Sequence, residues 1–223
     1  MAERQLNLYT TYSFTQAYFS LNEADQKALR KRIVDEVSGA AEATFLYSIF
    51  PTRPDSDFLI WSAWGADEES STHVAFEKMG TVVQGLRTYI QPMQTLWGFT
   101  RVSMYARGKS EQDMDPYDAE RSMYFIAYPF AKTKEWYLMS MDARQGQMNE
   151  HMKLGKQYPE IKQLLLYSFG LQDHEFVVAY ETNILPKFSD LVRDLRSTEA
   201  RRHTAMDAPI IVGMYQTPEA FIR

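Results

Sequence analysis

The sequence predicts an α+β fold made of two copies of one split β-α-β motif. The order strand, helix, strand, strand, helix, strand runs through residues 6–107 and repeats through residues 122–215. In each copy, helices would cover one face of a four-stranded antiparallel sheet and leave the other face bare. We therefore expect the two sheets to bury their bare faces against each other as a barrel-like sandwich. Aromatic residues make up 14% of the chain and methionines number 12, which suits large buried surfaces or a flat hydrophobic ligand.

The first copy opens with the alternating segment Leu6–Phe14, which predicts a strand. Ser20 and Glu23 have the spacing of a capping box, so a helix is expected to begin there and to end at Gly39. The other elements expected in this half are strands over Thr44–Phe50, Phe58–Trp64 and Leu96–Arg107 and a helical stretch over Glu68–Tyr89.

The second copy is expected to open with a strand over Ser122–Phe130 and to continue with a helix over Met139–Tyr158. Apolar residues recur at helical spacing within Lys187–Arg201 and predict a second helix there. The strands expected in this half are completed by Lys162–Phe169, Glu175–Glu181 and Ile210–Tyr215.

A polar, acidic segment separates the two copies. Residues 109–120 contain almost no large aliphatic side chain, which is typical of a linker. The chain is therefore expected to divide into an N-terminal half, residues 1–108, this linker, and a C-terminal half, residues 121–223.

Composition and charge are those of a soluble globular protein. Hydrophobic residues make up 45% of the chain and charged residues 24%. The net charge is −5, with basic and acidic residues interleaved, which argues against a nucleic-acid-binding face. The lack of cysteine excludes disulfides and thiolate metal sites. No secretory signal is recognisable and no apolar run approaches the roughly 18 residues of a membrane span, so a cytoplasmic protein is expected.

Of the four histidines, His151 is the candidate ligand for a transition metal or haem iron. Its neighbours one helical turn away include Gln147, Met148 and Gly155, which are small or flexible enough to let a flat ligand approach. A histidine in the core or at an interface is the alternative interpretation.

The other three histidines are not expected to bind a metal. His73 and His174 lie in polar segments and are expected to be exposed, and His203, in the charged run RRHT, is expected on a solvated face. The spacing of the four histidines forms no HExxH or paired-histidine motif, which argues against a multi-histidine zinc or non-haem iron site.

Four further side chains are candidates for a site in the second half. Tyr128 and Lys132, four residues apart at a strand end, would share one face of the sheet, although the pattern alone favours an aromatic packing contact and a solubilising lysine. Trp136 has the pattern of a core residue. Gln163 is an isolated amide in an apolar strand, and is either an outward-facing residue or one polar group in an apolar pocket.

Taken together, the segments YPFAKTKEWY, NEH and RSTEARRHT resemble the chlorite dismutase family, and within it the coproheme decarboxylases of haem biosynthesis. The resemblance is strongest over Tyr128–Gly213, whereas in the first half only the order of elements is similar. The family fold is a duplicated ferredoxin-like, dimeric α+β barrel that commonly assembles into a pentameric ring. The resemblance therefore implies a homo-oligomer, and by that precedent a pentamer.

The resemblance implies a role for each candidate residue. His151 would be the proximal ligand of the haem iron, with no other metal expected, and Trp136 would contact the same cofactor. Tyr128 would form a radical that removes a hydrogen from a propionate β-carbon, and Lys132 would orient the propionate carboxylate and manage protons. Coproheme would be both cofactor and substrate, hydrogen peroxide the oxidant and haem b the product.

Gln163 falls where the family carries its distal residue. Chlorite-degrading members have an arginine there, whose charge holds chlorite, so an uncharged glutamine argues against chlorite dismutation. The interval from His151 to Gln163 is one residue shorter than in firmicute enzymes, which makes Leu164 the alternative distal residue. Pro209 stands where some decarboxylases use a serine to hold a propionate. The arginines that could bind a propionate upstream of the tyrosine are Arg101, Arg107 and Arg121.

The function that the resemblance implies is hydrogen-peroxide-dependent oxidative decarboxylation of Fe-coproporphyrin III to haem b. A haem-binding or haem-handling protein of the same fold without this activity is the first alternative. A chlorite dismutase is the second, and it is disfavoured by Gln163.

Overall fold

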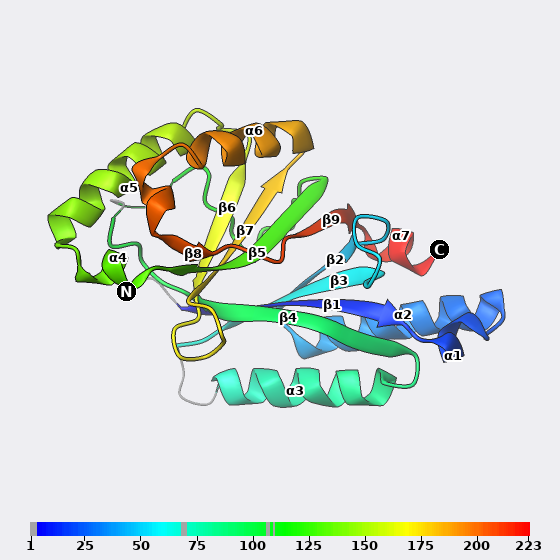
Figure 1. The fold of residues 1–223 in the computed structure, drawn as a ribbon. Coiled ribbons are helices and arrows are strands. Elements are labelled where there is room, and N and C mark those ends of the chain that lie inside the picture. Colours follow the sequence, from blue (N-terminus) through cyan, green and yellow to red (C-terminus); the bar gives the residue numbers. More distant parts are fainter. Residues whose placement is uncertain (1–3, 68–70, 106–107, 109) are drawn as a thin grey trace.

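The two halves of the chain repeat one arrangement of elements in the computed structural model, which describes residues 4–67, 71–105, 108 and 110–223 (Figure 1). The first half consists of β1 (Gln5–Phe14), α2 (Glu23–Ala40), β2 (Ala43–Ser48), β3 (Phe58–Gly65), α3 (Ser71–Leu86) and β4 (Ile90–Thr100). The second half consists of β5 (Tyr124–Lys132), α5 (Met141–Gly155), β6 (Lys162–Tyr167), β7 (Phe176–Thr182), α6 (Leu185–Leu195) and β9 (Ile211–Gln216). The predicted duplication of a split β-α-β motif is confirmed.

The strands of both halves form one antiparallel sheet that closes into a barrel. Its order is β7-β6-β4-β1-β3-β2-β9-β5-β8, and an additional pairing of β7 with β5 completes the ring. Each half contributes the same internal order, β4-β1-β3-β2 in the first half and β9-β5-β7-β6 in the second. The halves meet edge to edge where β2 pairs with β9 and β4 with β6. The α+β barrel fold is therefore confirmed, and hydrogen bonds at these two seams join the predicted sheets.

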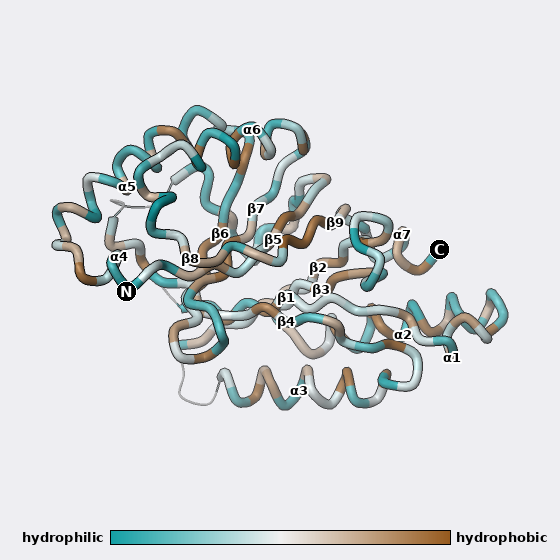
Figure 2. The backbone as a smooth tube through the Cα atoms, viewed as in Figure 1, coloured by the Kyte–Doolittle hydropathy of each residue, from teal (hydrophilic) through white to brown (hydrophobic). Residues whose placement is uncertain are grey.

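The barrel encloses a core of its own, because alternate residues of each strand point inward. Figure 2 shows strong hydrophobic colouring along β5 and β9, two strands that contribute to this core. The inward-facing residues are dominated by large aromatic side chains with little or no exposed surface, among them Tyr9, Tyr47, Trp61 and Phe125.

Helices cover the outer faces of both halves (Figure 1). On the N-terminal half, Leu29, Ile33 and Val37 of α2 are buried in a cluster with residues of β1 and β3. On the C-terminal half, Phe188 and Leu191 of α6 are buried against residues of β5 and β7.

The predicted capping box at Ser20 is wrong. A short helix, α1 (Gln16–Phe19), precedes α2, and the Ser20 hydroxyl donates a hydrogen bond back to the Gln16 carbonyl at 2.9 Å. The cap of α2 is Asn22, whose side chain accepts a hydrogen bond from the Asp25 N–H at 2.9 Å.

Several element boundaries differ from the prediction. Strand β4 begins at Ile90, because it pairs with β1 from Phe14 onward, and ends at Thr100. Helix α6 ends at Leu195 and is followed by a 3-10 turn. Residues 68–70 and 106–107, within two predicted elements, lie outside the described residues. The elements that were not predicted are α1, α4 (Lys134–Leu138), η1 (Glu199–His203), β8 (Thr204–Met206) and α7 (Pro218–Ile222).

The segment between the halves packs against the barrel next to Gln163. The Gln163 N–H donates to the Gln112 carbonyl at 2.7 Å, and the Met114 N–H donates to the Gln163 carbonyl at 2.8 Å. Met114 is buried among the barrel residues. This segment therefore adds a short parallel bridge at the edge of β6.

Candidate functional site

Helix α5 differs from the other long helices because it has no buried residue. Its main contacts are with α6 and η1 rather than with a strand, and Figure 1 shows it on the outer side of β5–β7. Its inner side is half-buried and combines apolar, small and polar residues. The half-buried residues of this side are Arg144, Gln145, Gln147, Met148, His151, Met152, Leu154 and Gly155.

The matching helix of the N-terminal half, α2, shows what a filled interface looks like. It buries Leu29, Ile33, Val34, Val37 and Ala40 against the sheet. At α5 an equally apolar stripe is missing, so the inner face of the helix is available to something other than the sheet. The two helices have equivalent places in the topology, but only α2 buries side chains against its sheet.

His151 lies on this half-buried face of α5. Burial, assisted by the positive charge of Lys132, lowers the pKa of His151 to about 4. The imidazole is therefore neutral near pH 7, the form in which histidine binds a metal. The end of β5 and α5 are linked through η1, because the Ala200 carbonyl accepts a hydrogen bond from Lys132 Nζ at 3.4 Å and the Glu199 N–H donates to the Glu150 carboxylate of α5 at 3.1 Å.

Tyr128 lies on the outer face of β5, against the cluster that α6 covers. Its hydroxyl is 3.5 Å from the hydroxyl of Tyr180 on β7, and the two rings are stacked with centroids 6.0 Å apart. Burial raises the pKa of Tyr128, so the phenol is protonated at neutral pH. A protonated phenol can lose a proton and an electron together.

Lys132 is the last residue of β5, and its ammonium is held between two elements. Its Nζ lies 4.5 Å from the ring centroid of Trp136 on α4 and donates a hydrogen bond to the Ala200 carbonyl of η1 at 3.4 Å. Burial, followed by the charge of Arg201, lowers the pKa of Lys132 to about 8. The group is thus cationic at neutral pH and poorly solvated, which favours pairing with a carboxylate.

Gln163 and Leu164 face opposite sides of β6. Leu164 packs against the barrel core, whereas Leu165 belongs to the outer cluster under α6. Since side chains alternate along a strand, Gln163 shares the outer side with Leu165 and is exposed. Of the two alternative distal residues, Gln163 is the one on the side of α5.

His203 is half-buried, and the expectation of a solvated face was wrong. Its ring lies 5.8 Å from the Trp136 ring, and its Nε2 is 3.4 Å from Nε2 of Gln147 on α5. The charged run around it concealed this position, because η1 turns the histidine inward while Arg202 stays exposed.

His174 is also buried, with 8% of its surface exposed, so the expected exposure was wrong here too. It ends the turn between β6 and β7, and burial lowers its pKa. His73, on α3, is exposed as expected. Neither residue is brought to the region around His151 by the contacts that the structure describes.

Arg121 cannot bind a ligand on the outer face, because its side chain lies inside the barrel. It is 2% exposed, its Nη1 is 3.7 Å from the carboxylate of Glu181, and its guanidinium lies over the rings of Phe45 and Trp61. The Tyr47 hydroxyl donates to the same Glu181 carboxylate at 3.0 Å. The arginine is thus part of a buried ion pair.

The other candidates for propionate binding are placed differently. Arg101 lies with its guanidinium 5.9 Å from the ring centroid of Tyr167, on β6. Arg107 lies outside the described residues. Pro209 is exposed and follows a cis peptide bond from Ala208.

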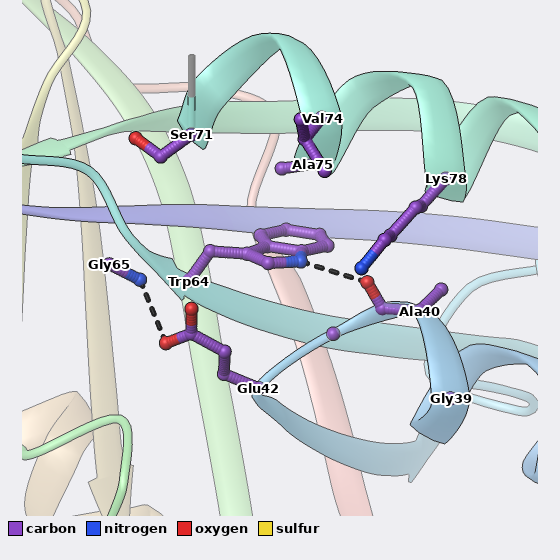
Figure 3. Close-up of a pocket in the computed structure, with 10 residues that line it drawn as sticks. Gly39, Ala40, Glu42, Trp64, Gly65, Ser71, Val74, Ala75 and Lys78 are labelled. Carbon is purple, nitrogen blue, oxygen red and sulfur yellow. Dashed lines mark hydrogen bonds between the residues drawn. The ribbon is translucent and has the colours of Figure 1, made fainter. Parts of the chain in front are cut away.

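A cavity of about 270 Å³ lies elsewhere, between α2 and α3 (Figure 3). Trp64 and Lys78 line it, and the Trp64 Nε1–H donates to the Ala40 carbonyl at 2.9 Å. Glu42 accepts a hydrogen bond from the Gly65 N–H at 2.9 Å. No residue predicted for the site lines this cavity, so its size has no bearing on the chemistry around His151.

The residues around α5 fit an iron porphyrin. A porphyrin supplies four nitrogen ligands, so one neutral imidazole from His151 suffices on one side of the iron. Met148, Met152 and Leu165 offer half-buried apolar surface for a planar ring. Lys132 offers a cation for a carboxylate. Among the described residues, no three His, Cys, Asp or Glu side chains gather as they would around a metal ion without such a ring.

No helix in the described part of the chain has the length and apolar character needed to cross a bilayer.

Comparison with known proteins connects this geometry to one family. The model of the chlorite dismutase family matches residues 23–216. A curated coproheme decarboxylase from Mycolicibacterium smegmatis is 30% identical over 169 residues, which cover 75% of this chain and 71% of the relative. One from Staphylococcus carnosus is 28% identical over 198 residues, covering 80% and 76%.

Solved structures share the fold. A mutant chlorite dismutase from Candidatus Nitrospira defluvii superposes with a TM-score of 0.85 at 19% identity and covers 98% of this chain and 94% of its own. At that identity the likeness establishes the barrel architecture.

Proposed function

Because the chain belongs to the chlorite dismutase family, we propose that it is an enzyme that oxidatively decarboxylates coproheme to haem b with hydrogen peroxide. The observation that supports the proposal is that Tyr128 faces the outer cluster under α6 and that Lys132 contacts η1, which packs against α5, the helix of His151. A neutral imidazole, a protonated phenol and a desolvated ammonium are the three groups that this reaction requires.

We propose that the porphyrin lies between the inner face of α5 and the outer face of β5–β7. The imidazole of His151 would bind the iron from the α5 side, and Gln163 would lie on the opposite side of the ring. The Trp136 side chain, which is 3% exposed, would form the wall of the site next to Lys132 and exclude water there. When bound, the iron provides the oxidising equivalents of the peroxide.

Tyr128 would transfer those equivalents to the substrate. Its phenol loses a proton and an electron, and the resulting phenoxyl radical takes a hydrogen atom from the β-carbon of a propionate. A second one-electron oxidation and release of carbon dioxide leave a vinyl group. For each propionate the balance is propionate, hydrogen peroxide and one proton giving vinyl, carbon dioxide and two waters.

Lys132 would hold the carboxylate that is lost. An ammonium that faces Trp136 has few water partners, so a carboxylate that replaces them is held firmly. Positioning the carboxylate beside Tyr128 brings the β-carbon into reach of the phenoxyl oxygen. Arg201, whose charge affects the pKa of both side chains, adds to the positive potential there.

Chlorite dismutation is disfavoured by Gln163. An amide donates hydrogen bonds but carries no charge to hold chlorite and its hypochlorite product, whereas a guanidinium would do both. A haem-binding protein without catalysis would have no use for a phenol and a desolvated lysine on the same strand.

The test is addition of ferric coproheme to the purified protein without oxygen, followed by hydrogen peroxide and mass analysis of the porphyrin. Two successive losses of carbon dioxide would support the decarboxylase. Tight binding without a change in mass would instead identify a haem-handling protein. Turnover of chlorite to oxygen would overturn the argument from Gln163.

Three further properties belong to the same proposal. We propose a cytoplasmic homo-oligomer, a pentamer by the family precedent, in which residues 109–120 link the two halves of each chain. Light scattering after size-exclusion chromatography would measure the assembly, and a mass of one or two chains would contradict the pentamer.

A further inference from the structure

The pairing of β5 with its neighbours becomes irregular at Lys132, the residue that matters for the proposed reaction. Its ladder with β7 ends at the pair Phe130–Phe176, and its register with β8 shifts between Ala131 and Lys132. One step along β5 spans two residues of β8, so the extra residue, Ala205, lies in β8, and the Lys132 N–H has no strand partner on the β7 side, where the ladder has ended. The backbone of Lys132 therefore needs another acceptor.

Glu175 supplies that acceptor. The Lys132 N–H donates to Oε2 of Glu175 at 2.7 Å, and the Glu175 N–H donates to the Phe130 carbonyl at 3.3 Å. Glu175 directly precedes β7, so both its backbone and its side chain hold the irregular end of β5. A carboxylate that accepts from a backbone N–H makes a stronger bond than a neutral acceptor.

The same oxygen also holds the helix that carries Trp136. The hydroxyl of Tyr137, the next residue of α4, donates to Oε2 of Glu175 at 2.5 Å. Burial and this hydrogen bond raise the pKa of Tyr137, so its hydroxyl keeps the proton that it donates. The Oε2 atom of Glu175 thus links the backbone of Lys132 to α4, the helix that carries Trp136.

The position of the Lys132 ammonium follows from this arrangement. Its Nζ lies over the ring of Trp136 and reaches the Ala200 carbonyl, and these contacts require α4 and the end of β5 to keep their relative placement. Neither contact involves the Glu175 side chain directly. Glu175 would act on Lys132 through its backbone N–H and on Trp136 through Tyr137, the next residue of α4.

We propose that Glu175 is the positioning residue for Lys132, fixing the end of β5 and α4 so that the ammonium faces the propionate carboxylate. The catalytic part of this inference rests on the proposed function. The geometric part does not, since it concerns the chain without porphyrin.

The geometry is tested by nuclear magnetic resonance on porphyrin-free protein labelled at the lysine ε-carbon. A lysine above an indole ring experiences its ring current, so the Lys132 ε-protons should resonate at lower frequency than those of solvated lysines. Their signal is assigned by its loss in Lys132→Arg. Glu175→Gln keeps an acceptor oxygen and should keep the shift, whereas Glu175→Ala should lose it.

Two controls make the result decisive. Glu160→Ala removes an exposed carboxylate from the turn before β6 and should leave the Lys132 signal unchanged. Tyr137→Phe removes one of the two donors to Glu175 and should reduce the shift partially, which keeps the test valid if Glu175→Ala does not fold. An unchanged Lys132 signal in both Glu175→Ala and Tyr137→Phe would overturn the proposal.

The catalytic consequence is measured separately. With coproheme and peroxide, Glu175→Ala should lower kcat by on the order of 10²-fold with a much smaller loss of coproheme affinity and an unchanged Soret band, and Glu175→Gln should restore most of the rate. A loss of affinity equal to the loss of rate would indicate a merely structural role. If the unmodified protein does not decarboxylate coproheme, the proposed function fails and the resonance experiment still decides the geometry.

Discussion

The side-chain amide of Gln172 pairs with the backbone of β4 at Trp97 as a neighbouring strand would. Its Oε1 accepts from the Trp97 N–H at 2.9 Å, and its Nε2 donates to the Thr95 carbonyl at 3.0 Å. The β4–β6 seam has direct pairing at only two positions. Gln172, in the turn after β6, therefore extends the closure of the barrel.

Gln172→Leu should lower the free energy of unfolding by about 1 kcal/mol, because the half-buried Trp97 N–H loses its acceptor and the exposed Thr95 carbonyl loses its donor. Chemical denaturation measures the change. Gln172→Glu keeps an acceptor and loses the donor, so it should fall between Gln172→Leu and the unmodified protein. Equal stability of all three proteins would mean that the seam does not depend on this amide.

Arg121→Met should be more damaging, costing about 3–5 kcal/mol near neutral pH, because it leaves the Glu181 carboxylate buried without a cation. Adding Glu181→Leu should recover most of that loss. Burial raises the pKa of the Glu181 carboxyl group. The group therefore stabilises the fold at a pH below its pKa in the unfolded chain, and this contribution is lost as the pH rises through its pKa in the folded protein. Denaturation at pH 5 and pH 8 should therefore show a larger cost of Arg121→Met at pH 8.

Tyr128→Phe should bind ferric coproheme as the unmodified protein does and lose carbon dioxide at least about 100-fold more slowly, since phenylalanine has no O–H to oxidise. Mass analysis after peroxide addition measures the products. Tyr124→Phe, on the same strand and face, is the matched control and should turn over normally. Unchanged turnover in Tyr128→Phe would place the radical elsewhere.

His151→Ala should shift the Soret band of bound ferric coproheme, because the iron loses its imidazole ligand. Added imidazole should restore the original spectrum by occupying the space left by the side chain. An unaltered spectrum in His151→Ala would show that another residue binds the iron.

The pH dependence of catalysis should report Lys132. Burial lowers its pKa to about 8, so the ammonium that binds a carboxylate is lost as the pH rises through that value. We expect kcat/KM for coproheme to fall above pH 8 and Lys132→Arg to lack this fall, since a guanidinium stays charged. A fall of equal size in both proteins would assign the titration to another group.

Much of the fold could be predicted because its signals are local. Strand alternation and helical periodicity recur in the same order in both halves, and that order defines the duplicated motif. The partners at the seams could not be predicted, because β2 and β9 or β4 and β6 are far apart in the sequence and meet only when the barrel closes.

The same distinction applies to the site. His151, Tyr128 and Lys132 stand in recognisable segments, whereas Glu175 and Tyr180 carry no local signal and act through contacts with distant residues. His203 was misplaced because its neighbours are charged, and only the turn of η1 directs it inward. The choice between Gln163 and Leu164 depends on which face of β6 each side chain occupies, which pairing with β7 decides.

The lack of buried residues on α5 has a kinetic consequence. The barrel has its own packed core, so a ligand at the proposed site on the outer side could be exchanged without separating any pair of strands. If the porphyrin binds there as proposed, its loading and release would depend on small displacements of α5 against α6 and η1. A substitution that stiffens the barrel should leave the residence time of the product unchanged, whereas one that tethers α5 should lengthen it.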